Sequence, residues 1–391
     1  MKRSLILLCA LAMQTCLGAT YSWSVFVRPL RDLTGLSQGV TQLPFSVFYF
    51  AFPATMILSG TFLRLLGPRG CAVTGGLLFG AGWLVASLGS YHFGFTVLGI
   101  GLLAGIGVGL AYIVPIAVCV QWFPERKGLV TGIAVAGFGG GAALVGQIAG
   151  LLLFESGVGP FQTMGMLGAA FVVLVPAAGS VMEFVEEFRG GKVPQLEFSA
   201  FAGRREFQIL FLAMVAGLVA GFAVNANLKD LSPVAGPRLG VTAVSVFALA
   251  NAAGRLLWGA IFDRLRSSTA VRANLLLQSA VAGSGIWLLR SEEGFLAFAL
   301  LTGFNYGGVL VIYASSVARL WGGEHVGQVY GVLFSANIVA AGAPVLAGFS
   351  FGLTGSFNAS LGAIAFLLAA TAVLVWTAAP SLNDERSRTL T

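Results

Sequence analysis

Charged side chains are scarce in this chain of 391 residues. Asp, Glu, Lys and Arg make up only 9% of the sequence, whereas they make up about 25% of a soluble domain. Hydrophobic residues make up 57%, and the mean hydropathy is +0.90. This composition excludes a globular soluble enzyme and predicts a polytopic membrane protein.

Residues that build catalytic or metal sites are equally sparse. The four cysteines show no CxxC or metal-binding spacing, and the two histidines, His92 and His325, fall in loops. The sequence contains neither paired catalytic carboxylates nor a Ser-His-Asp arrangement, so we expect no enzymatic activity, no cofactor and no metal. The net charge of +7 does not indicate a nucleic-acid partner, because the basic residues lie in short loops.

What the chain has is twelve apolar spans, which predict twelve transmembrane helices. They cover residues 4–26, 39–62, 71–91, 94–121, 128–154, 159–182, 207–228, 240–262, 270–289, 294–318, 326–352 and 357–379. The longest polar stretch, 183–206, separates six spans from six. We therefore expect an N-terminal six-helix half (1–182), a cytoplasmic linker (183–206) and a C-terminal six-helix half (207–391).

The positive charges predict the orientation in the membrane. With both termini inside, 16 of the 22 Lys and Arg residues lie in cytoplasmic segments and five lie outside. Cytoplasmic loops carry the excess of Lys and Arg in membrane proteins. We expect an integral protein of the cytoplasmic (inner) membrane with both termini in the cytoplasm.

The remaining cation, Arg255, is the main candidate for a functional residue. It lies about eight residues before Asp263, so its Cα is roughly 12 Å inside one end of an apolar span. An arginine near the middle of a bilayer is costly, and it usually faces a protein interior or a water-filled cavity. A planar guanidinium can hold both oxygens of a carboxylate. An ion pair within the span is the competing interpretation, but all 15 acids fall in loops or at span ends; interaction with backbone carbonyls stays open.

Two loops repeat a glycine-and-charge pattern after the second span of each half. The first contains Gly60, Arg64 and Arg69, and the second contains Gly259, Asp263 and Arg264. Such a loop can dock on neighbouring helix ends and act as a conformational latch. It can equally be a basic loop that only sets the topology.

Several longer motifs carry a resemblance to known transporters. Residues 21–26 (YSWSVF), 122–129 (WFPERKGL) and 131–139 (TGIAVAGFG) resemble the oxalate–formate antiporter family. Residues 251–264 are similar to the eighth helix of monocarboxylate transporters. Together with the six-plus-six spans and the repeated loop, these motifs resemble the major facilitator superfamily. The resemblance implies a binding site between the halves, with Arg255 as its carboxylate-binding residue.

The resemblance also suggests further substrate-binding residues. Asn251 shares the face of Arg255 and can bind the arginine, bind a substrate, or simply join helices. Tyr306 matches a tyrosine that lines the site in the antiporters, and Tyr112 is a second candidate phenol; either can instead satisfy its hydroxyl on a neighbouring helix. Tyr21 is a site candidate or an interfacial residue. Asn337 falls where the antiporter has a lysine, which leaves one buried cation here.

We therefore expect a secondary transporter that moves small monocarboxylates such as lactate or pyruvate by alternating access. A symported proton is a further expectation, and we expect the chain to work as a monomer in the lipid bilayer. An oxalate–formate-type anion exchanger is the alternative in the same class. An anion channel or a non-transporting membrane sensor is the alternative from a different class.

Overall fold

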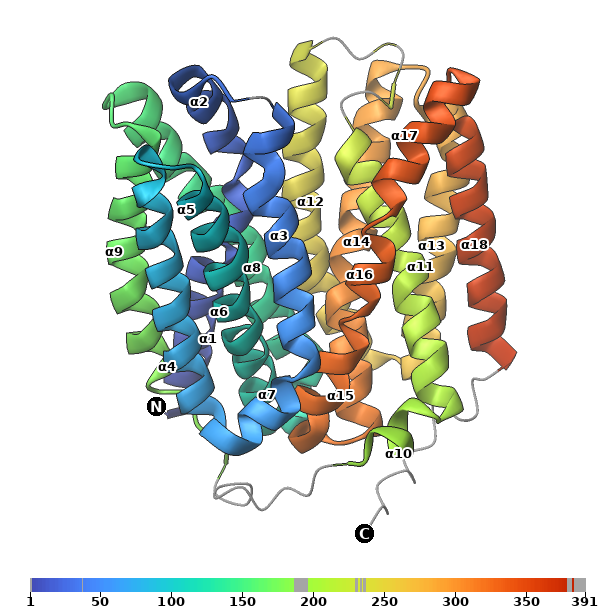
Figure 1. Ribbon diagram of the computed structural model, residues 1–391. Coiled ribbons are helices and arrows are strands. Elements are labelled where there is room, and N and C mark those ends of the chain that lie inside the picture. The colour runs from blue at the N-terminus through green and yellow to red at the C-terminus, as the bar shows by residue number, and fades with distance from the viewer. Residues whose placement is uncertain are drawn as a thin grey trace. The chain divides into compact units, whose positions relative to one another are not determined.

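A computed structural model describes residues 2–36, 38–185, 196–228, 231–232, 234, 237–377 and 382. Every regular element in these ranges is a helix, and the expectation of an all-α membrane protein is confirmed (Figure 1). Each of the twelve expected apolar spans is helical over most of its described residues. Within the described ranges, nine helices are long and apolar enough to cross a membrane.

The helices form two compact units. Unit 1 contains Met1–Pro124, Ile133–Gln195 and Gly323–Ser335, and unit 2 contains Glu125–Gly132, Leu196–Gly322 and Ala336–Thr391. Residues 186–195 of the expected linker lie outside the described residues. Two short segments belong to a different unit from the rest of their expected half. The start of the fifth span belongs to unit 2, and the start of the eleventh span belongs to unit 1.

The helices of unit 1 are, in chain order, α1 (Lys2–Leu17), η1 (Gly18–Ser22), α2 (Ser24–Thr34), α3 (Gln38–Ile57), α4 (Ser59–Ser87), η2 (Leu88–Ser90), α5 (Gly94–Thr96), η3 (Val97–Leu103), α6 (Ala104–Ala111), α7 (Ile113–Trp122), most of α8 (Lys127–Gly150), η5 (Leu151–Glu155), α9 (Pro160–Gly179), η7 (Gly323–His325) and α15 (Val326–Leu333). The turn η4 (Pro124–Arg126) and helix α8 cross the boundary between the units.

The helices of unit 2 are α10 (Phe198–Ala202), α11 (Arg205–Asn227), α12 (Pro237–Arg264), α13 (Ser267–Leu288), α14 (Glu292–Leu320), α16 (Ala336–Ala340), α17 (Ala343–Thr354) and α18 (Asn358–Thr377). Helix α12 carries Arg255, and α14 lies directly beside it (Figure 1). The expected span 326–352 is divided among α15, α16 and α17.

Local sequence signals explain several helix ends and breaks. Gly67 has a φ of 67°, which breaks α4 between the second and third expected spans. Only glycine adopts this left-handed conformation without a steric cost, and Pro68 follows because its fixed φ suits the start of the next helix. At the start of α14, the Ser291 side chain accepts a hydrogen bond from the Gly294 N–H, as an N-cap residue does.

The glycine-rich run of α8 lies against α1 in unit 1. A Cβ at Gly137 would be 2.9 Å from the carbonyl oxygen of Leu11, and one at Gly141 would overlap the carbonyl of Thr15. Close approach of two helix backbones is the usual use of small residues in membrane helices. The run is a packing surface between two helices.

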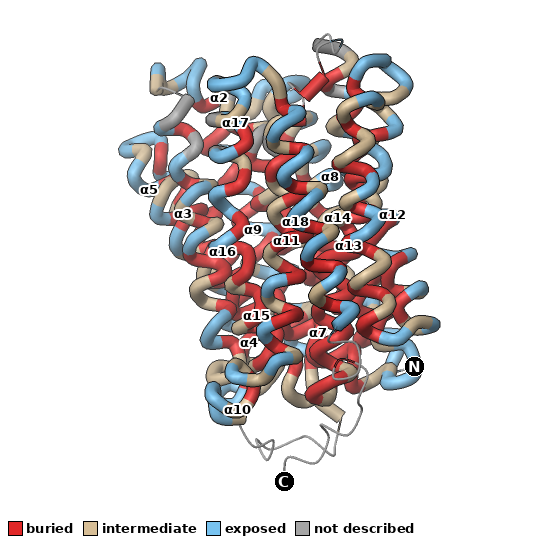
Figure 2. The backbone as a smooth tube through the Cα atoms, turned by 90° about the vertical axis from the view of Figure 1, so that its right-hand side faces the viewer, coloured by how far each residue is buried: buried red, intermediate tan, exposed pale blue. Residues whose placement is uncertain are grey.

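Large apolar side chains cover the outer faces of the helices as well as their inner faces. On α18, Leu361, Leu368 and Val375 are buried at seven-residue intervals, whereas Phe366 and Trp376 are mostly exposed. Figure 2 shows the same alternation of buried and exposed residues along individual helices. Exposed apolar faces of this kind suit contact with lipid.

Candidate functional site

Arg255 lies buried in α12, with 4% of its surface exposed. Its Nε donates a hydrogen bond of 3.0 Å to Oδ1 of Asn251, one helical turn earlier. Asn251 is 7% exposed, and its Nδ2 donates to the carbonyl oxygen of Gly303 on α14 at 3.4 Å. The asparagine thus fixes the orientation of the guanidinium plane.

Three glycines bring the backbones of α12 and α14 together around this pair. A Cβ on Gly254 would overlap the carbonyl oxygen of Phe304, and one on Gly307 would overlap that of Asn251. A Cβ on Gly303 would likewise overlap a carbonyl of α12. The close crossing is possible only with small residues, and it places α14 directly against the turn that carries Arg255.

Tyr306 and Asn337 also belong to unit 2. Tyr306 immediately precedes Gly307, and its ring packs against Gly221 of α11 and lies 6.1 Å from the ring of Phe247 on α12. Tyr306 thus contacts the same helix as Arg255. Asn337 is buried in α16, on an element separate from α12 and α14.

Tyr21 and Tyr112 belong to unit 1, where both pack on one phenylalanine. The ring of Tyr21 is 4.9 Å from that of Phe138, and the ring of Tyr112 is 5.1 Å from it, both edge to face. Such pairs are favourable beyond the area they bury. Tyr21 also stacks on Tyr49 at 5.8 Å, and Tyr112 is buried. The structure therefore joins the two tyrosines in one aromatic cluster.

The second repeated loop ends in a specific contact within unit 2. Oδ1 of Asp263 accepts the N–H of Gly128 at 2.8 Å, and Oδ2 accepts that of Leu129 at 2.9 Å. These N–H groups belong to the first turn of α8, where they have no partner within the helix and where a negative charge is favoured. Gly259 and Gly128 pack so closely that a Cβ on either would overlap the carbonyl of the other.

Unit 1 contains a related contact without the acid. The Ser59 hydroxyl donates a hydrogen bond of 2.5 Å to the carbonyl oxygen of Gly327 in α15. A Cβ at Gly60 would be 2.5 Å from Gln328, and one at Gly331 would overlap the Ser59 oxygen. The paired glycines of α15, four residues apart, repeat the spacing of Gly128 and Gly132 in α8.

The basic residues of the repeated loops are placed differently from Asp263. Arg64, Arg69 and Arg264 are all exposed. None of the described hydrogen bonds gives them a role in the two glycine contacts.

Two basic residues near the Asp263 contact were not singled out by the sequence. Arg319 donates to the carbonyl oxygens of Leu265 at 2.6 Å and Phe262 at 3.1 Å, and its guanidinium lies 4.0 Å from the Phe262 ring centre. Lys127 donates to the carbonyl of Ala318 at 3.1 Å. Cations at helix C-termini stabilise the last carbonyls. Their position at span ends was the available sequence signal.

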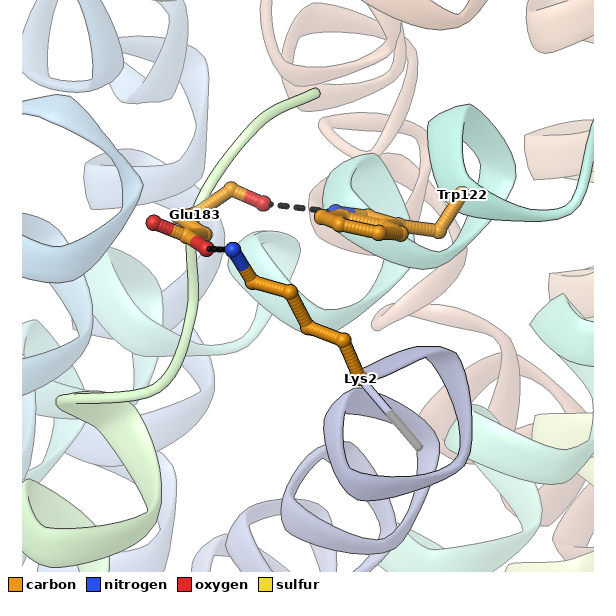
Figure 3. Close-up of polar contacts among 3 residues, drawn as sticks. All are labelled: Lys2, Trp122 and Glu183. Atoms are coloured by element: carbon orange, nitrogen blue, oxygen red, sulfur yellow. Dashed lines mark hydrogen bonds and ion pairs between the residues drawn. The ribbon is translucent and has the colours of Figure 1, made fainter. Parts of the chain in front are cut away.

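A second polar cluster lies at the start of α1 in unit 1 (Figure 3). Nζ of Lys2 lies 2.6 Å from a carboxylate oxygen of Glu183. The indole Nε1 of Trp122 donates to the Glu183 carbonyl at 2.8 Å, and the Lys2 ammonium lies 5.6 Å from the Trp122 ring centre. The cluster ties α1 and α7 to the segment that follows α9. Because the side chain of Lys2 is 58% exposed, solvent weakens the ion pair.

No group of three His, Cys, Asp or Glu side chains in the described part of the chain is placed to hold a metal ion. The arrangement around Arg255 instead offers a buried, oriented guanidinium, which is suited to a carboxylate.

Comparison with known proteins identifies the family and the fold. The sequence profile of the Major Facilitator Superfamily matches residues 4–341. The chain is 25% identical to the oxalate:formate antiporter of Oxalobacter formigenes, over 93% of this chain and 90% of that protein. It is 26% identical to monocarboxylate transporter 13 of Bos taurus, over 90% and 82%. The crystal structure of the transporter FucP superposes with a TM-score of 0.78 at 17% identity, over 96% of this chain and 98% of FucP.

Proposed function

Because this chain belongs to the major facilitator superfamily and is an integral membrane transporter, we propose that it carries small monocarboxylates such as lactate or pyruvate by alternating access. The observation that carries the proposal is Arg255, an arginine with 4% of its surface exposed inside a membrane-spanning helix. A cation retained at such a cost is a functional-site residue by default.

The chemistry of the guanidinium favours a carboxylate ligand. Nε of Arg255 donates to Asn251, so the plane of the guanidinium is set before a ligand arrives. A carboxylate accepts two parallel hydrogen bonds from such a plane, and a pre-oriented donor loses less entropy on binding. In this proposal Asn251 is a positioning residue for Arg255, and Tyr306 is a candidate donor from α14. Asn337, Tyr112 and Tyr21 remain proposed contacts.

The sequence around α14 to α17 favours a monoanion over a dianion. No lysine occurs between residues 294 and 352. The resemblance to the antiporter family places Asn337 at or near the position of that family's lysine. A second carboxylate without a cation would be buried at a high free-energy cost. The match to the oxalate:formate antiporter nevertheless covers 93% of this chain. Exchange of oxalate-type and formate-type anions is therefore the second candidate function. Oxalate that displaces lactate at equal concentration would favour it.

We further propose that a proton accompanies the substrate. No acid lies within an apolar span, so the proton either enters with the substrate or binds transiently to an acid at a span end. Three such acids are Asp32 in α2, Glu155 at the end of η5 and Glu324 in η7. Neutralising any one of them should leave part of the stimulation by an inward pH gradient intact.

Two contacts to glycine-bearing helix starts, that of Asp263 with Gly128 and that of Ser59 with Gly327, support the proposed latch. Asp263 holds the first turn of α8, and Ser59 holds α15. We propose that Gly60 and Gly259 permit these contacts in one conformation of the transport cycle, and that the contacts break in another. Arg64, Arg69 and Arg264 then act through their charge, which also orients the chain with both termini in the cytoplasm.

Uptake into proteoliposomes tests the proposed function. Purified protein should accumulate labelled lactate and pyruvate with saturation and with trans-stimulation, and an inward pH gradient should increase the rate. Uptake that does not respond to the gradient would eliminate symport and leave uniport or exchange. High anion flux without saturation would indicate a channel, and no flux for any carboxylate would indicate a sensor.

A further inference from the structure

Four buried polar side chains of unit 2 form a cluster that the proposed transport chemistry does not use. Asn274 and Gln278 lie on α13, and Thr302 and Asn305 lie on α14. Nδ2 of Asn274 donates to the Asn305 carbonyl at 2.9 Å, and Nε2 of Gln278 donates to Oδ1 of Asn274 at 2.7 Å. The first hydrogen bond joins α13 to α14, and the second links two residues one turn apart on α13.

Three atoms of the cluster have no hydrogen-bond partner among the described residues: Oδ1 of Asn305, Oε1 of Gln278 and Oγ1 of Thr302. The side chains of Gln278 and Thr302 are 3% and 5% exposed. A buried polar atom without a hydrogen bond is destabilising, and native proteins nearly always supply a partner.

A small cavity adjoins these two side chains. Its volume is about 10 Å³, and both Gln278 and Thr302 line it. The remaining walls are apolar and include Val224 of α11, Phe298 of α14 and Ile364 of α18. About 10–15 Å³ is the minimum that holds one water molecule, which also needs at least two polar partners. The cavity meets both requirements, whereas a purely apolar cavity would stay dry.

We propose that one water molecule binds in this cavity between α13 and α14. The water donates one hydrogen bond to Oε1 of Gln278 and forms a second hydrogen bond with the Thr302 hydroxyl. Because Thr302 and Asn305 lie one helical turn apart, the water closes a ring of hydrogen bonds that runs from α14 through Asn274 and Gln278 and back to α14. Hydrogen bonds linked in this way polarise and strengthen one another. Tyr306 follows Thr302 by four residues, so the ring braces the helix that carries it.

The substitution Thr302→Val distinguishes a hydrated cavity from a dry one by the sign of its effect. In a dry cavity the hydroxyl has no partner, and replacing it by a methyl group of the same shape should stabilise the protein. In a hydrated cavity the substitution removes one of the two partners of the water and leaves Gln278 unsatisfied. We expect the thermal midpoint of the purified protein to fall by on the order of 2 °C.

Thr371→Val is the matched control, because the Thr371 hydroxyl is already bonded to the Leu367 carbonyl at 2.7 Å. We expect it to lower the midpoint less than Thr302→Val does. A structure of the unmodified protein at a resolution that shows waters should contain density within hydrogen-bond distance of both oxygens.

A midpoint that rises in Thr302→Val would overturn the proposal, and so would a cavity without density. A thermal midpoint that increases with sodium but not with potassium, and that loses this response in Thr302→Val, would also overturn the proposal. It would show that the cavity binds a cation and not a water molecule.

Discussion

The carboxylate of Asp263 accepts a hydrogen bond of 2.8 Å from the backbone N–H of Gly128. The aspartate lies in the last turn of α12 and the glycine in the first turn of α8, so a side chain from one expected half caps a helix from the other. The contact depends on Gly259, since a Cβ there would overlap the Gly128 carbonyl.

Substitution of Asp263 should weaken this helix cap in graded steps. Asp263→Asn keeps an acceptor but loses the charge, whereas Asp263→Ala loses both hydrogen bonds. We expect the alanine variant to lose about 0.5–2 kcal/mol of stability and the asparagine variant less. Thermal unfolding of the purified protein measures the difference. Glu293→Ala, at an exposed acid in the first turn of α14, is the control, and an equal loss there would contradict the cap.

Substitution of Gly307 should separate α14 from α12. A Cβ at this position would overlap the Asn251 carbonyl and come within 3.0 Å of the Arg255 backbone nitrogen. We expect Gly307→Ala to lower the thermal midpoint and to weaken lactate binding, because overpacking costs about 1–3 kcal/mol. Gly362→Ala on α18 is the control, since nothing lies within 4 Å of its Cβ. That variant should be neutral or slightly stabilising. Normal stability and normal lactate binding in Gly307→Ala would contradict this prediction, because they would show that α12 and α14 can move apart without loss.

Some of these relationships could be predicted from the sequence and others could not. Hydropathy located the helices, and the four-residue spacing of Asn251 and Arg255 placed them on one face, where the structure joins them. The partner of Asp263 could not be predicted, because Gly128 is 135 residues away in the chain. Spacing within one segment carries no information about which distant helix end it meets.

The same limit applies to Gln278 and Thr302. Each is an isolated polar residue in an apolar span, with no spacing that relates one to the other. Only the fold brings the two side chains to one cavity. The resemblance to known families supplied candidate site residues, but it could not show that Tyr21 and Tyr112 share Phe138 as a neighbour.

Acidification should destabilise the protein through His325. Burial lowers the pKa of this histidine below its ordinary value of 6.5, and the charge of Glu324 partly offsets the effect. His325 also precedes the first turn of α15, where a positive charge is unfavourable. The unfolded chain then binds the proton more readily, so stability is unaffected well above pH 6.5 and falls as the pH drops through 6.5 toward the lowered value.

A series of thermal unfolding measurements between about pH 7.5 and 5.5 tests this effect. His325→Gln should lose less stability on acidification than the unmodified protein. Glu324→Gln should lose more, because it removes the charge that raises the pKa. Identical pH profiles for all three proteins would rule out His325 as the titrating group.

Arg255 is the central element of the proposed function, and calorimetric titration of lactate into purified protein tests it most directly. The unmodified protein should bind lactate, and Arg255→Ala should show no measurable binding while it remains folded. Arg255→Lys should bind about 10- to 100-fold more weakly, since hydrogen bonds to charged groups contribute about 1.5–3 kcal/mol and lysine cannot form the two-pronged contact. Arg290→Ala, at an exposed arginine of the same unit, should bind normally. Unchanged lactate binding by Arg255→Ala would contradict the account.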